Sequence, residues 1–118
     1  MSTITAHLAQ SQPALVEHLL SAYHLQQPTL AALTGFHLRS IAGWKAGQPP
    51  TAAAQRKLLE TQRLLQKLAQ LMDPATIESW LRSPAPAFQP QTPLQVIEAG
   101  HVDRIWHMIQ HVESGSPA

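Results

Sequence analysis

LTGFHLRSIAGWKAGQPP is the stretch over residues 33–50 that decides the fold. A short apolar helix over residues 29–34 is expected to end at Gly35, and a second helix then runs over about residues 37–46. Gly47 ends the second helix, and the two prolines that follow prevent its continuation. Two short helices joined by a glycine-containing turn are typical of a helix-turn-helix, although an ordinary helical hairpin shows the same pattern.

The second of these helices has two unlike faces. Leu38 and Ile41 are expected to face the core, and Trp44 to pack against the long helix that follows. The outward face carries side chains suited to the major groove, where an arginine can bond guanine through two hydrogen bonds. The residues expected to contact DNA are Thr29, His37, Arg39, Ser40 and Lys45. Thr29 would also cap the first of these two helices and bind a phosphate there. Gly43 in this helix predicts a close approach by a backbone or by DNA.

The rest of the chain also reads as helical, with no convincing alternation of period two. The longest expected helix covers residues 51–72, begins at Thr51 and carries a wide leucine stripe (Leu58, Leu64, Leu65, Leu68, Leu71, Met72). Asp73 and Thr92 each precede a proline and therefore mark two further helix starts. A closing helix is expected after Gly100. These signals predict an all-α fold of up to seven helices.

The charges divide the chain into two parts near Asp73. Residues 1–72 carry six basic and two acidic residues, a net charge of +4, and residues 73–118 carry two basic and five acidic residues, a net charge of −3. We therefore expect a helix-turn-helix and dimerisation domain over 1–72, which includes the long connecting helix, and a small helical domain over 73–118. Chance alone can also produce an imbalance of this size in a short chain.

Several classes of protein are disfavoured by the sequence. The chain lacks cysteine, which excludes disulfides and thiolate metal sites. No signal peptide or apolar run long enough to span a bilayer is evident, so we expect a cytoplasmic protein. Asp103, His107 and His111 share one helix face, but the sequence places no general base or further metal ligand at a spacing typical of an enzyme or metal site. We therefore expect no enzyme, no metal and no cofactor.

A resemblance to known families adds to these inferences. Residues 30–50 resemble the helix-turn-helix of Xre-type regulators, with Gly35, Trp44 and Gly47 at matching places. The second half resembles the C-terminal domain of Xre/MbcA/ParS-type antitoxins. The matching features there are Trp80-Leu81, Pro84, Pro86, Phe88, Thr92-Pro93-Leu94, Gly100 and a closing apolar helix that ends near Gly115.

The resemblance implies an antitoxin of a type II toxin–antitoxin system. Its partner would be a RES-domain toxin that consumes NAD, and the antitoxin would also bind operator DNA as a homodimer and repress its own operon. The residues expected to contact the toxin are Met108, His111, Glu113, Ser114, Gly115, Ser116 and Ala118. The alternatives are a stand-alone helix-turn-helix repressor and an interaction module with a degenerate helix-turn-helix.

Overall fold

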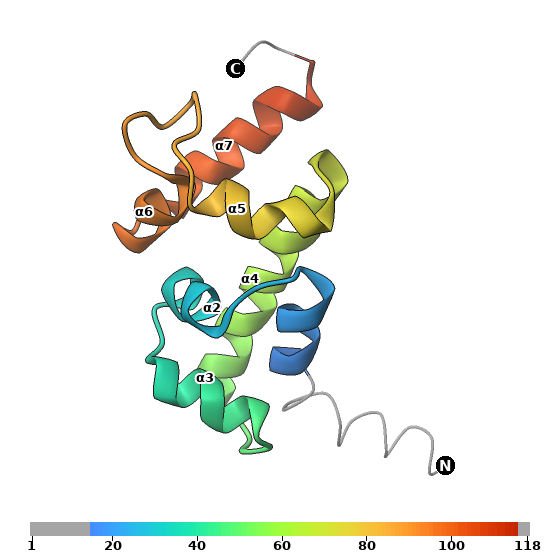
Figure 1. Ribbon diagram of the computed structural model, residues 1–118, viewed down its shortest axis with the longest axis vertical. Helices are drawn as coiled ribbons and strands as arrows, with labels where there is room; N and C mark the ends of the chain where they lie inside the picture. Colours follow the sequence, from blue (N-terminus) through green and yellow to red (C-terminus); the bar gives the residue numbers. More distant parts are fainter. Residues whose placement is uncertain (1–14, 116–118) are drawn as a thin grey trace.

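The described part of the computed structural model, residues 15–115, contains helices and no strand, which confirms the all-α prediction (Figure 1). The first helix is described over residues 15–22. It is followed by α2 (Gln27–Thr34), α3 (Leu38–Lys45), α4 (Ala52–Leu71), the 3-10 turn η1 (Pro74–Thr76), α5 (Ile77–Leu81), α6 (Pro93–Glu98) and α7 (Val102–Glu113).

The long helix α4 is the spine of the molecule. The first helix, α2 and α3 surround its lower part in Figure 1, and α5, α6 and α7 lie at its upper part. The molecule is elongated, with extents of 49 × 30 × 24 Å. As a result, α3 and the C-terminal end of α7 lie near opposite ends of the long axis (Figure 1).

Side-chain caps fix the starts of the later helices. The Thr51 hydroxyl accepts the Ala54 N–H at 3.1 Å at the start of α4, as predicted. Thr92 and Gln95 form a reciprocal capping box at the start of α6, with Pro93 in the first turn. Asp73 accepts the Ala75 N–H at 2.9 Å, so it begins the 3-10 turn that leads into α5.

The prediction that Thr29 caps the first helix of the helix-turn-helix, α2, is wrong. The cap lies three residues earlier, at Gln26, and Pro28 stands in the first turn. Proline suits this place because the first turn leaves its backbone N–H groups without intrahelical partners. Thr29 is therefore a helical residue, and its side chain is completely buried.

A single hydrophobic core joins the two parts of the chain. Leu58, Leu64, Leu65 and Leu68 of the α4 stripe are buried in one cluster with residues from the first helix, α2, α3 and the whole C-terminal part. Helix α2 packs on α6, and α4 packs on α7. The parts expected over 1–72 and 73–118 therefore have no separate cores in the described structure. The stripe contributes these four leucines to the core, and Leu71 and Met72 at its end are half-buried.

Glu78 of α5 ties the two parts together at the start of α2. Its Oε1 atom accepts the Gln26 N–H at 3.1 Å, and its Oε2 atom accepts the Thr29 hydroxyl at 2.6 Å and the Arg82 Nε–H at 2.7 Å. Arg82 also donates from Nη2 to the Thr29 oxygen at 2.6 Å. Burial by itself would raise the pKa of Glu78, but these hydrogen bonds and the Arg82 charge together lower the pKa below its ordinary value.

Candidate functional site

The helix-turn-helix unit is formed by α2, a short turn and α3. Gly35 ends α2 with a φ of +81°, and its N–H donates to the Ala31 carbonyl at 2.8 Å. Such a positive φ favours glycine, which has no Cβ to clash with the backbone. Phe36 follows in the turn and meets Trp44 edge-on, with ring centroids 5.1 Å apart. Together with the fully buried Ile41, this aromatic pair anchors α3 on the core.

The start of α3 presents its side chains to solvent. His37, Leu38 and Arg39 are exposed, and Ser40 is half-buried; these four residues line a hollow at the surface. The expectation that Leu38 faces the core is wrong, because 47% of it is exposed, whereas Ile41 is completely buried. Leu38 therefore belongs to the outward surface that also holds the predicted DNA contacts.

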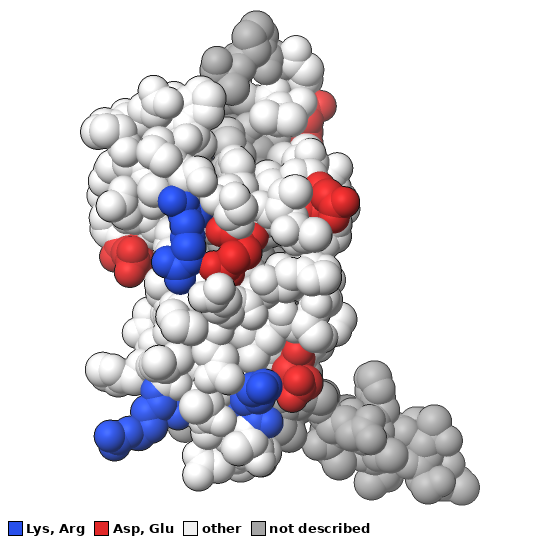
Figure 2. All heavy atoms as spheres, in the orientation of Figure 1, with Lys and Arg blue, Asp and Glu red and all other residues white. Residues whose placement is uncertain are grey.

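This end of the molecule is basic. No acidic residue occurs between Glu17 and Glu60, whereas Arg39, Lys45, Arg56 and Lys57 all fall in that interval. Lys45 is exposed at the last turn of α3. Figure 2 shows Lys and Arg side chains at the lower end of this face, where Figure 1 places α3, with most of the visible Asp and Glu side chains above them. A surface of this kind suits a polyanion.

Thr29 does not belong to this surface. Its hydroxyl is bonded to Glu78 and Arg82, and its side chain is buried. The Glu78 carboxylate also accepts the Gln26 N–H at the start of α2, the place where the sequence suggested a phosphate. An internal carboxylate therefore occupies the position that an external phosphate would need.

The loop after α3 folds back toward Gly43. The Gln48 backbone N–H donates to the Gly43 carbonyl at 3.0 Å. A Cβ atom built at Gly43 would lie 2.5 Å from Oε1 of Gln48. That oxygen is the end of an exposed, flexible side chain that can rotate away, so this contact does not by itself require glycine.

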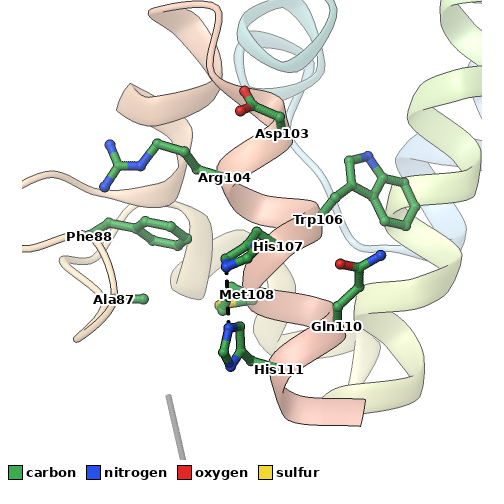
Figure 3. Close-up of a pocket in the computed structure, with 9 residues that line it drawn as sticks. All are labelled: Ala87, Phe88, Asp103, Arg104, Trp106, His107, Met108, Gln110 and His111. Carbon is green, nitrogen blue, oxygen red and sulfur yellow. Dashed lines mark hydrogen bonds between the residues drawn. The ribbon is translucent and has the colours of Figure 1, made fainter. Parts of the chain in front are cut away.

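A second surface lies along α7. A hollow of about 680 Å³ is lined by Ala87 and Phe88 of the proline-rich loop and by Asp103, Arg104, Trp106, His107, Met108, Gln110 and His111 of α7. In Figure 3, Arg104 extends from α7 to the Phe88 ring, and its guanidinium carbon lies 5.4 Å from the ring centroid. This distance falls within the range of a cation–π contact. The hollow contains two of the predicted toxin contacts, Met108 and His111.

His107 and His111 form a pair on the rim of this hollow. Their Nε2 atoms are 3.2 Å apart, and the rings meet edge-on at 4.7 Å (Figure 3). Within residues 15–115, no group of three or more histidine or acidic residues is placed to hold a metal ion. Asp103, one turn earlier, does not complete such a group.

The closing helix reaches Glu113, close to the predicted end near Gly115. Glu113, one of the predicted toxin contacts, is the last residue of α7 and forms an ion pair with Lys67 of α4 at 2.8 Å. The Ser114 hydroxyl donates to the His111 carbonyl at 3.0 Å. Gly115 follows with a φ of +79°. Ser116 and Ala118 lie outside the described residues.

The sequence analysis did not identify several residues that line the hollow along α7. Phe88 was named only as a feature of the family resemblance; it is 3% exposed and forms a wall of the hollow. Arg104 and Trp106 line the same hollow from α7. The spacing of three and four residues among Arg104, His107, Met108 and His111 was a usable signal, because such residues share a helix face.

Comparison with known proteins gives no relative for this chain. No protein-family model matches it, and no curated protein and no solved structure matches it either. The resemblance to antitoxins therefore rests on the sequence features quoted above. Among the described residues, no helix combines the length and the apolar character that crossing a bilayer requires.

Proposed function

We propose that this protein is an antitoxin of a type II toxin–antitoxin system. It binds and inhibits a RES-domain, NAD-consuming toxin through α7, and as a cytoplasmic homodimer it represses its own operon through α3. The observation that carries the proposal is the pairing of two unlike surfaces at opposite ends of one molecule. A basic helix-turn-helix lies at one end and an apolar hollow along α7 at the other.

The DNA-binding part of the proposal is supported by the exposure of α3. Helix α3 is the second helix of the motif, the one that enters the major groove in helix-turn-helix proteins. Its exposed first turn and its exposed Lys45 lie in a part of the chain without carboxylates. Arg39 and Lys45 therefore supply attraction for the phosphate backbone.

The toxin-binding part is supported by the hollow along α7. Protein interfaces commonly have an apolar centre surrounded by a polar rim. Phe88, Trp106 and Met108 supply apolar surface here, and Asp103, His107 and His111 supply polar groups beside it. The C-terminal half is also acidic, as expected of a surface that occupies a basic dinucleotide pocket.

Reciprocal variants test the two parts separately. His111→Ala removes the ring of an exposed residue of the hollow and is expected to weaken toxin binding at least tenfold, because truncation at a hot-spot position commonly costs about 2 kcal/mol or more. Leu38→Glu, at the other end, should leave toxin binding unchanged and weaken DNA binding. The measurements are co-purification with the product of the neighbouring gene, cellular NAD level, and binding to the upstream promoter. Failure of the unmodified protein to bind or protect would refute the antitoxin proposal.

The contribution of residues 113–118, the C-terminal tail, is tested with a chain that ends at Val112. This truncation also removes the ion pair between Lys67 and Glu113, so Lys67→Ala is the matched control that removes the pair and keeps the tail. If the short chain binds toxin but NAD falls, while Lys67→Ala protects, the tail blocks the active site. If both protect fully, the helix face alone inhibits the toxin.

A stand-alone repressor is the second candidate. The observation in its favour is the same hollow, whose volume of about 680 Å³ lies in the range of small-molecule sites. This candidate predicts promoter binding by the unmodified protein without any toxin partner. Light scattering on the full chain tests the homodimer that either function would use on a palindromic operator.

A further inference from the structure

Leu38 is the most exposed large apolar residue of the described structure, at 47%, ahead of Val112 at 43% and Leu59 at 42%. It is the first residue of α3, and its neighbours in the surface hollow are His37, Arg39 and Ser40. Ile41, one turn further along α3, is by contrast completely buried. A leucine left half in water forgoes hydrophobic stabilisation that a partner could restore.

The charges around Leu38 favour a polyanion as that partner. Arg39 is adjacent, Lys45 stands at the other end of α3, and the chain carries no carboxylate between Glu17 and Glu60. A second copy of this surface would bring like charges together, which is unfavourable. B-DNA provides both negative charge and, in its major groove, one apolar group, the C5 methyl of thymine.

We propose that Leu38 reads the methyl group of a thymine in the major groove. The inference rests on the proposed DNA-binding function and adds a specificity determinant to it. Leu38 and Arg39 are consecutive residues in the first turn of α3, so their side chains diverge around the helix and meet neighbouring base pairs. The recognised half-site therefore contains a thymine within one or two base pairs of the guanine that Arg39 bonds.

Deoxyuridine supplies the direct test, because it keeps the hydrogen-bonding groups of thymine and lacks only the methyl. The DNA is selected from a random library with the full-length protein, and each thymine is then replaced singly. Loss of one buried methyl is expected to weaken binding by the unmodified protein about fourfold at one thymine in each half-site. Leu38→Ala should bind thymine and deoxyuridine DNA equally at that position.

Two further variants separate the methyl contact from general effects. Val112→Ala truncates a side chain of similar exposure, 43%, on α7, and should keep the full deoxyuridine effect. Leu38→Gln should shift the preference at that position from thymine toward adenine, because glutamine can bond adenine through two hydrogen bonds. A gain of new specificity cannot come from a misfolded protein.

The outcomes are distinct. If the unmodified protein selects no DNA, both the DNA-binding function and this inference are wrong. If it selects DNA but every deoxyuridine substitution is neutral, or if Leu38→Ala retains the deoxyuridine effect, DNA binding stands and the role of Leu38 is wrong. If Leu38→Ala instead changes the molecular mass measured by light scattering, Leu38 contacts a second copy and the inference is again wrong.

Discussion

Glu78 secures the start of α2 from a position 52 residues further along the chain. The carboxylate accepts hydrogen bonds from a backbone N–H, a buried threonine hydroxyl and an arginine, so it is needed in its charged form. A charged partner strengthens such bonds, and a partly buried group left without them is costly. A single ionised side chain thus links the helix-turn-helix to the C-terminal part.

The resulting prediction concerns stability against pH. The pKa of Glu78 is lower in the folded protein than its ordinary value of 4.5, so the folded state favours the ionised form. The stabilisation is fully present above about pH 4.5 and is lost as the pH falls through the folded pKa. Glu78→Gln should lower the free energy of unfolding by about 1–3 kcal/mol at pH 7 and flatten this acidic pH dependence.

Urea unfolding between pH 3 and pH 7 measures both effects. Glu98→Gln, at an exposed glutamate of α6, is the matched control and should change the free energy of unfolding by less than about 0.5 kcal/mol. A Glu78→Gln protein as stable as the unmodified one at pH 7 would contradict the proposal that the Glu78 carboxylate stabilises the contact between α2 and α5.

At the scale of the helices, local capping decides where α4 and α6 begin. Helix α6 has six residues and is too short to form alone. Its start therefore depends on the capping box formed by Thr92 and Gln95 and on the packing of its buried residues in the core. Thr92→Ala removes the hydroxyl that accepts the Gln95 N–H and should lower stability by about 1 kcal/mol.

Thr92→Ser is the control for that prediction, because serine keeps the capping oxygen. Thermal unfolding followed by circular dichroism compares the two variants, and the serine protein should melt close to the unmodified one. Equal losses in both variants would show that the threonine methyl, rather than the cap, is what matters at this position.

At the scale of the whole molecule, the single core predicts that the first half does not fold alone. A chain of residues 1–72 would lose the packing of α2 on α6 and of α4 on α7, together with the Glu78 bonds to Gln26 and Thr29. We expect this fragment to show no cooperative thermal transition, whereas the full chain shows one. A sharp transition in the fragment would establish residues 1–72 as an autonomous domain.

The sequence by itself determined where most helices begin and end. Thr51, Thr92, Gly35 and Pro93 act on groups within four residues of themselves, so their effects can be predicted without the rest of the chain. The leucine period of α4 likewise predicted its buried face, since helical spacing alone places those residues together.

Only the tertiary structure decided how these helices share one core and which residues remain outside it. Thr29 looked like a cap, but a carboxylate from α5 reaches it across 49 positions and draws it into the interior. Leu38 looked like a core residue, but 47% of it is exposed, and Ile41 is the residue of α3 that the core buries. The hollow beside α7 needs Phe88 from a distant loop. Periodicity cannot reveal such contacts, because burial depends on which other surface arrives, and that is set by the packing of the whole chain.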